Sequence, residues 1–229
     1  MSIQAVDPVL VLALVLNFFI LANSQLRMVV FAVAIQGAIL GLMYPIAHQG
    51  FNPPAGVAVE AIGALTLVRL VLLAMAIVLI KGYVIPRLLF RAMREANIIW
   101  HVESVIGLTP TLLLGAVGTA LALAFAQSLP IKPGHTSTLV IPASLATALT
   151  GFLMLITRRK AISQVLGYVV LENGIFIFGL LLIEAVPVLV EFGVLLDLFV
   201  GVFVMGIIIN HVNRSFPAAT SEHLSMLRE

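Results

Sequence analysis

Long runs of apolar residues, separated by short polar segments, dominate this sequence. A helix needs about 20 mostly apolar residues to cross the hydrocarbon core of a membrane. Runs of about that length predict seven transmembrane helices, near residues 7–23, 28–47, 57–80, 105–127, 138–157, 163–183 and 188–210. The segments between them are rich in Asn, Gly and Pro, which favour turns. The pattern therefore predicts an all-α, polytopic membrane protein.

Basic residues are concentrated in every second break between these runs. Loops that stay on the cytoplasmic side of a membrane are enriched in Lys and Arg. If the N-terminus is outside and the C-terminus inside, the inner loops and tail hold ten of the twelve basic residues. These ten are Arg27, Lys81, Arg87, Arg91, Arg94, Arg158, Arg159, Lys160, Arg214 and Arg228. We therefore predict seven spans with an N-out/C-in orientation.

The longest predicted inner loop, residues 81–104, carries a helical pattern of its own. Arg87, Arg91 and Arg94 share one helical face, and Pro86 is suited to the first turn of a helix. We therefore predict a short amphipathic helix on the cytoplasmic surface after the third span. The same arginines would also serve as a positive signal that only fixes topology, or as a docking surface for a partner subunit.

Composition limits the chemistry that this chain can perform alone. The chain of 229 residues is 62% hydrophobic and 10% charged, whereas a soluble domain carries about 25% charged residues. It has no cysteine, which excludes disulfides and cysteine-ligated metal or iron–sulfur centres. It also lacks phosphate-loop, dinucleotide-binding and nucleophile motifs. We expect no catalytic centre, cofactor, nucleic-acid partner or small-molecule substrate of its own.

Two carboxylates interrupt the apolar runs near their centres. Glu172 lies in the middle of 163–183, and Asp197 lies in the middle of 188–210. A charged side chain at the bilayer centre costs about 2.5–3.5 kcal/mol on insertion scales, and such groups often carry protons or ions. The two could lie at one depth and share a proton as relay groups. The alternative is that each is protonated and only forms a hydrogen bond to another helix.

Arg69 is a third ionisable residue within a predicted span. A guanidinium keeps its charge, so it needs a carboxylate partner such as Glu172, Asp197 or an acid of another subunit. Alternatively, it reaches the membrane surface or meets helix carbonyls. Polar residues such as Asn17, Gln36 and Asn173 predict interhelical hydrogen bonds. Weaker candidates for a proton route are Glu184, Glu191, His211 and Asn173.

Two segments resemble a known family. The stretches RRKAISQVLGYVVLENGIFIFG (158–179) and VEFGVLLDLFVGVFVMGIIINHV (190–212) resemble component E of hydrogenase-4-type complexes. The last three spans of that family are similar to the small three-helix subunit of respiratory complex I. They are also similar to the short C subunit of multi-subunit cation/proton antiporters. The resemblance is most specific over roughly 138–212.

The resemblance implies partners, a location and roles for residues. It implies a multi-pass subunit of a bacterial or archaeal cytoplasmic membrane, bound to large antiporter-like subunits. The [NiFe] and iron–sulfur centres would belong to partner subunits. Two helices of the three-helix relatives each carry a midplane Glu, and Glu172 and Asp197 are the natural counterparts. The relatives place the first Glu two residues after a glycine, whereas here Val169 follows Gly167 at that spacing.

The predicted spans divide the chain into three parts. Residues 1–104 form three spans and the amphipathic helix, 105–137 form the fourth span and an outer loop, and 138–229 form the complex I-like part and tail. We expect a membrane-arm subunit that contributes Glu172, Asp197 and Arg69 to proton translocation. The alternatives are a structural adaptor without a proton path and a subunit of a multi-subunit cation/proton antiporter. An independent transporter is disfavoured, because the chain lacks inverted repeats.

Overall fold

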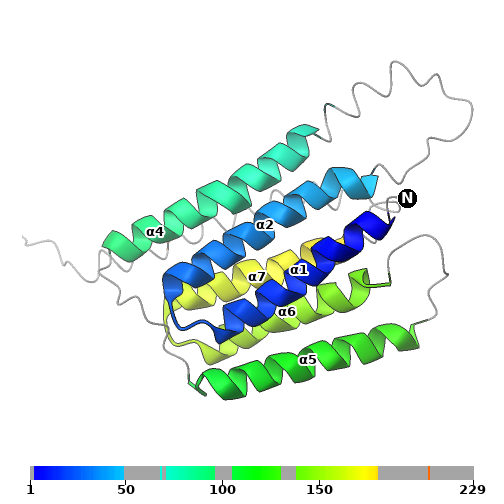
Figure 1. Cartoon of the computed structure of the whole chain (residues 1–229). Helices are drawn as coiled ribbons and strands as arrows, with labels where there is room; N and C mark the ends of the chain where they lie inside the picture. Colours follow the sequence, from blue (N-terminus) through cyan, green and yellow to red (C-terminus); the bar gives the residue numbers. More distant parts are fainter. Residues whose placement is uncertain are drawn as a thin grey trace, which may run out of the picture.

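The protein is a bundle of long helices (Figure 1). The computed structural model describes residues 3–48, 68, 71–95, 105–129, 138–179 and 206. Within these ranges there is no strand, so the fold is all-α as predicted. The elements are α1 (Ile3–Ala22), α2 (Leu26–His48), η1 (Ile80–Val84), α4 (Ile85–Glu95), α5 (Leu108–Ser128), α6 (Val140–Thr157) and α7 (Ala161–Gly179).

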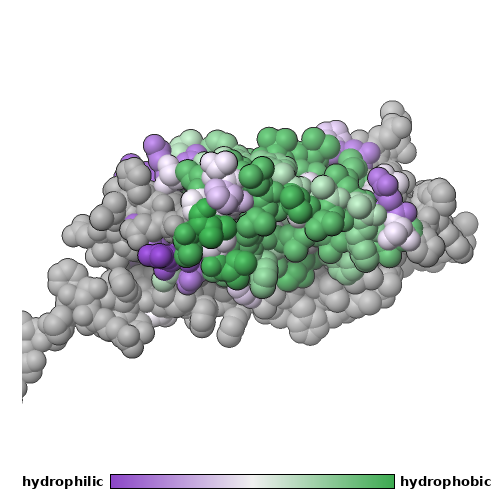
Figure 2. Space-filling view, turned by 90° about the horizontal axis from the view of Figure 1, so that it is seen from below, coloured by the Kyte–Doolittle hydropathy of each residue, from purple (hydrophilic) through white to green (hydrophobic). Residues whose placement is uncertain are grey.

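The helices have the length and surface of membrane spans. In the described part of the chain, five are long and apolar enough to cross a membrane. They are Leu26–Met43, Val71–Arg94, Leu108–Ser128, Val140–Thr157 and Ala161–Gly179. Large apolar side chains such as Phe31, Leu121 and Phe152 are exposed on the outside of the bundle. Figure 2 shows one such face, which is hydrophobic along its middle. These features make the protein membrane-embedded.

Part of the predicted topology lies outside the described residues. Of the predicted span 188–210, only Gly206 is described, and most of the outer half of 57–80 is not described either. The count of seven spans and the N-out/C-in orientation therefore stay predictions. The division into 1–104, 105–137 and 138–229 also stays a prediction.

The third span differs from the prediction. The backbone is helical from residue 71 to residue 95, with η1 as a π-helical turn inside it. Lys81 therefore lies within the span Val71–Arg94, and its assignment to an inner loop is wrong. The predicted amphipathic helix is present as α4, but it is not separate from the third span, because the helical backbone runs through η1 into α4 without a break. The helix continues because the residues after Lys81 are mostly apolar and Lys81 itself is buried with polar partners.

The amphipathic pattern of α4 is nevertheless present. Arg87, Arg91 and Arg94 are exposed, whereas Leu89 and Met93 are buried against the bundle. The arginine face thus belongs to the end of a transmembrane helix that packs against its neighbours.

Two apolar clusters occupy the two ends of the bundle interior. The basic-end cluster joins the end of α1, the start of α2, α4, the end of α6 and the start of α7; it includes Leu21, Leu26, Leu89, Met93, Met154 and Leu166. The far-end cluster includes Leu10, Leu40, Met43, Ile77, Val140 and Ile177. The basic end is named for Arg27, Arg87, Arg91, Arg94, Arg158, Arg159 and Lys160, which belong to the helix ends and turns there. A layer of buried polar side chains separates the two clusters.

Candidate functional site

Glu172 is buried in the middle of the bundle. It lies on α7 about 17 Å along the helix from Ala161, given a rise of 1.5 Å per residue. Glycines hold this part of α7 directly against α6. A Cβ atom at Gly174 would collide with the backbone of Ala148, and one at Gly167 would lie 2.8 Å from the Cβ of Met154. Close backbone packing of this kind fixes the depth and the direction of Glu172.

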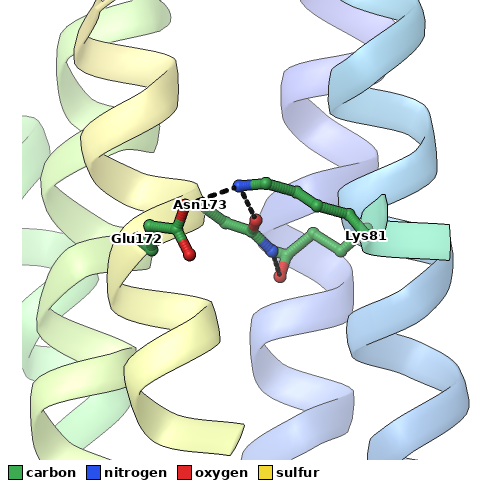
Figure 3. A network of polar contacts seen from close by, with 4 residues as sticks. Lys81, Glu172 and Asn173 are labelled. Carbon is green, nitrogen blue, oxygen red and sulfur yellow. Dashed lines mark hydrogen bonds and ion pairs between the residues drawn. The ribbon is translucent and has the colours of Figure 1, made fainter. Parts of the chain in front are cut away.

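The partner of Glu172 is Lys81 on η1. The Lys81 Nζ atom lies 3.3 Å from the Glu172 Oε1 atom, and the two side chains are only 1% and 5% exposed. Figure 3 shows the two side chains reaching toward each other from opposite helices. The sequence analysis had placed Lys81 in a loop and Glu172 in a span. In the structure their charges form a buried ion pair.

Local backbone chemistry directs Lys81 into the bundle. Pro86 has no N–H, and in a regular α-helix its ring would clash with the carbonyl group of Gly82. The chain instead forms a π-helical turn, in which the Ile85 N–H donates to the Ile80 carbonyl oxygen. Such turns insert one residue and change the direction of the side chains around them.

A glycine on α2 makes room for the stem of Lys81. A Cβ atom at Gly37 would lie 2.7 Å from the Lys81 Cβ and 3.3 Å from its Cδ. The lysine side chain therefore passes directly over Gly37 to reach α7. Gly41, one turn further along α2, faces Ile77 and Val78 of the same span instead. Together the two glycines bring α2 and the Lys81 helix into close contact.

The ammonium group has two further partners on α7. Lys81 donates a hydrogen bond to the Asn173 Oδ1 atom at 3.1 Å, and its Nζ lies 5.3 Å from the centre of the Phe176 ring. A carboxylate, an amide oxygen and an aromatic face thus surround the charge, and each of these groups attracts a cation. The arrangement satisfies a charge that would otherwise be costly at this depth.

A chain of amide side chains continues from Asn173 across the bundle. The Asn173 Nδ2 donates to the Gln36 Oε1 at 3.3 Å, and the Gln36 Nε2 donates to the Asn17 Oδ1 at 2.9 Å. The Asn17 Nδ2 then donates to the Thr147 Oγ1 at 2.8 Å. All four side chains are buried. The predicted interhelical hydrogen bonds of Asn17, Gln36 and Asn173 are thereby confirmed.

The donor-to-acceptor direction of these side-chain hydrogen bonds follows from Lys81. An ammonium group only donates, so Asn173 must present its oxygen to Lys81 and its NH₂ group to Gln36. The same reasoning fixes Gln36 and then Asn17. Every amide therefore has its oxygen toward the ammonium, and aligned hydrogen bonds of this kind strengthen one another.

Two members of the network are ionisable. Glu172 and Lys81 each have a charged and a neutral form, whereas the amides and Thr147 donate and accept hydrogen bonds without changing charge. The network lies between the basic-end and far-end clusters, which are both apolar. The pair can therefore hold or release a proton, while the amide chain keeps its partners in position.

Most of the other predicted site residues lie outside the described part of the chain. Asp197, Arg69, Glu184, Glu191 and His211 are among the residues whose structure is not described. Their roles, including a shared proton between Glu172 and Asp197, stay predictions. Among the described residues, no group of three or more His, Cys, Asp and Glu side chains could hold a metal ion.

Sequence reasoning missed Lys81. It follows a long apolar run, and a basic residue at that position is usually a topology signal. The available signals were the mostly apolar stretch from Tyr83 to Phe90, which only Arg87 interrupts, and the need of Glu172 for a counter-charge.

Comparison with known proteins gives one relative. Over 181 residues the chain is 32% identical to uncharacterized protein Rv0085 of Mycobacterium tuberculosis (strain ATCC 25618 / H37Rv). The match covers 76% of this chain and 82% of that protein. No protein-family model matches the chain, and no solved structure matches it.

Proposed function

We propose that this chain, which belongs to the same family as uncharacterized protein Rv0085 of Mycobacterium tuberculosis, is a membrane subunit of a hydrogenase-4-like or complex I-like redox assembly. In this assembly the Lys81–Glu172 pair is a proton-exchange site near the middle of the membrane. The observation that carries the proposal is the burial of this ion pair between two apolar clusters.

The energetics favour a functional reason for the pair. Replacing a buried ion pair by apolar side chains of similar volume is often neutral or stabilising. Packing alone therefore gives little reason to place a lysine and a glutamate at this depth. Ionisable groups within spans usually face a bundle interior and mark ion or proton routes. The resemblance of residues 158–179 to the hydrogenase-4 component supports the same role for Glu172.

Proton exchange at this site changes the charge around Lys81. When a proton reaches the Glu172 carboxylate, the ammonium loses its counter-charge and keeps the Asn173 oxygen and the Phe176 ring as partners. The Lys81 ammonium then passes its own proton onward, and the protonated Glu172 gives its proton to the neutral Lys81 amine, which restores the ion pair. The amide chain holds Asn173 in one orientation throughout. Asp197 is the proposed second relay group, and Arg69 is the proposed charge that modulates the two carboxylates.

The rest of the route and all electron chemistry belong to other chains in this proposal. Large antiporter-like subunits would continue the proton path within the bilayer. Soluble partners would hold the [NiFe] and iron–sulfur centres. This chain supplies one charged station and the helices that hold it.

A structural adaptor is the second candidate, and the amide chain favours it. The hydrogen bonds from Asn173 to Thr147 join four helices without any group that conducts protons. In an adaptor the Lys81–Glu172 pair would serve only to select one packing of the bundle. The two candidates assign the protein to the same assembly and differ in whether neutralising Glu172 affects proton movement.

Extraction from the native membrane in mild detergent, followed by mass spectrometry of the co-purifying chains, tests the assembly. We expect several antiporter-like subunits together with an iron–sulfur arm of the [NiFe] or quinone-reactive type. Antiporter-like subunits without a redox arm would point to a multi-subunit cation/proton antiporter instead. A protein that is recovered alone, or only with copies of itself, contradicts the proposal.

A further inference from the structure

Arg158 is a buried charge that the Lys81–Glu172 site does not use. It directly follows the last residue of α6 at the basic end, and it is 2% exposed. Its Nη2 donates to the Leu21 carbonyl oxygen at 3.3 Å, near the end of α1. Its Nε and Nη1 are buried and have no hydrogen-bond partner among the described residues. Unsatisfied buried donors cost about 1–3 kcal/mol each, and more when they are charged.

Burial also acts on the charge itself. Loss of solvent lowers the pKa of the Arg158 guanidinium, although a guanidinium keeps its proton in proteins. The charge therefore persists in an unfavourable environment. A bound anion would offset this cost and would accept the remaining hydrogen bonds.

Ser163 provides a second buried group without a partner. It lies in the first turn of α7, is 1% exposed, and its Oγ has no hydrogen-bond partner within the described part of the chain. The Gln164 N–H donates to the Lys160 carbonyl oxygen at 3.0 Å and closes the first turn. The N–H groups before it have no acceptor within the helix, and a helix N-terminus attracts negative charge.

The residues that follow Arg158 are basic, and the acidic side chains that the structure describes lie elsewhere. They are Asp7, near the start of α1 at the far end, and Glu172, in the middle of α7. The backbone of one further acidic residue, Glu95, ends α4 at the basic end. Arg159 and Lys160 follow Arg158 and add further positive charge. The Arg158–Ser163 region thus combines unsatisfied donors with an excess of positive charge.

We propose that Arg158 and Ser163 bind a phosphate oxyanion at the basic end of the bundle. The residue after a transmembrane helix lies at the depth of the lipid headgroups. Basic sites between transmembrane helices bind the headgroups of anionic lipids. A phosphate group offers several acceptor oxygens, which match the unsatisfied N–H groups of Arg158 and the hydroxyl of Ser163. Its source is either the headgroup of an anionic phospholipid or free phosphate.

A role of Arg158 in helix capping does not account for all of its donors. The hydrogen bond to Leu21 satisfies one of the last carbonyl groups of α1, where a positive charge is also favourable. That role uses Nη2 only. The Nε and Nη1 groups still require an acceptor.

The test measures lipid retention by the purified full-length protein with native mass spectrometry. Phosphatidylglycerol, phosphatidylcholine and inorganic phosphate are the three probes. We compare the wild type with Arg158→Gln, Arg158→Lys, Ser163→Ala and the matched control Arg159→Gln, which removes an exposed neighbouring charge. We expect the wild type to retain phosphatidylglycerol in preference to phosphatidylcholine. Arg158→Gln should weaken this retention about tenfold, as expected for the loss of one or two charge-assisted hydrogen bonds.

The controls separate a built site from surface charge. We expect Arg159→Gln to retain phosphatidylglycerol nearly as well as the wild type, and Ser163→Ala to show an intermediate loss. Competition by millimolar inorganic phosphate that depends on Arg158 would support the oxyanion site and identify free phosphate as a ligand. Equal losses in Arg158→Gln and Arg159→Gln, or no preference for phosphatidylglycerol in the wild type, would overturn the proposal. If Arg158→Gln does not fold, Arg158→Lys and Ser163→Ala decide, and wild-type retention by both contradicts the site.

Discussion

The Lys81→Met substitution removes the ammonium group from the centre of the bundle and keeps most of the side-chain volume. It leaves the Glu172 carboxylate buried without the counter-charge 3.3 Å away, and it deprives the Asn173 Oδ1 of its donor. Glu172→Gln does the reverse, since it leaves the ammonium with the Asn173 oxygen and the Phe176 ring. The double variant removes both charges.

The expected magnitudes follow from the geometry of the pair. At 3.3 Å and an effective dielectric constant of about 20, the attraction between the two charges is about 5 kcal/mol. Desolvation of the two groups offsets much of it, but removal of one partner still costs about 3–5 kcal/mol of the free energy of unfolding. The double variant should cost only about 1–3 kcal/mol, the penalty for the unpaired Asn173 oxygen. Lys81→Met and Glu172→Gln should therefore be coupled by at least about 3 kcal/mol.

Reversible unfolding in mixed detergent micelles, followed by far-UV circular dichroism, measures the free energies of unfolding of the wild type, the two single variants and the double variant. Arg159→Met serves as a control, because Arg159 is exposed and its charge should contribute little. We expect the double variant to be more stable than either single variant. Additive losses, within about 0.5 kcal/mol, would refute the ion pair as the structure places it.

Two glycine comparisons test the packing around the site. Gly37→Ala should displace the Lys81 stem, lower the free energy of unfolding by about 1–3 kcal/mol and reduce proton translocation. Gly41 faces the same span one turn away, so Gly41→Ala should lower the free energy of unfolding by a similar amount and leave proton translocation unchanged. Equal effects on proton translocation would show that only helix packing matters there. Gly174→Ala should destabilise the protein because its Cβ meets the α6 backbone, while Gly118→Ala should be neutral or stabilising by up to about 1 kcal/mol, since its Cβ would lie 3.7 Å from the nearest atom of Leu149. Thermal unfolding of both variants checks this order.

Apolar patterning predicted the helices well because the membrane imposes it. Runs of about 20 apolar residues predicted spans at α2, α5, α6 and α7, and these helices are present in the structure. The burial of Glu172 was also predictable from its place within such a run. In both cases the reason is local, since hydrocarbon selects apolar side chains at every position of a span.

The partners of the polar residues depended on packing that no local pattern contains. Asn17 and Gln36 were predicted to form interhelical hydrogen bonds, but their connection to Asn173 depends on how α1, α2 and α7 meet. The sequence analysis assigned Lys81 to a loop, whereas it lies within a helix. A buried charge is tolerated there because its partners offset the cost of burial, and those partners come from other helices. The π-helical turn that directs it arises from Pro86, which the sequence analysis had placed at a helix start.

Proton movement by the intact assembly after Glu172→Gln tests the central claim most directly. Membrane vesicles that contain the assembled complex are compared for proton uptake per electron transferred, with subunit content checked in each preparation. Asp7→Asn is the matched control, because it neutralises a carboxylate near the start of α1, at the far end of the bundle. The account predicts normal assembly, a normal Asp7→Asn variant and a roughly tenfold or greater loss of proton uptake for Glu172→Gln, since a positioned acid or base contributes about 10²–10⁴-fold to the step it serves. Unchanged proton uptake by a fully assembled Glu172→Gln complex would contradict it and leave the adaptor as the better description.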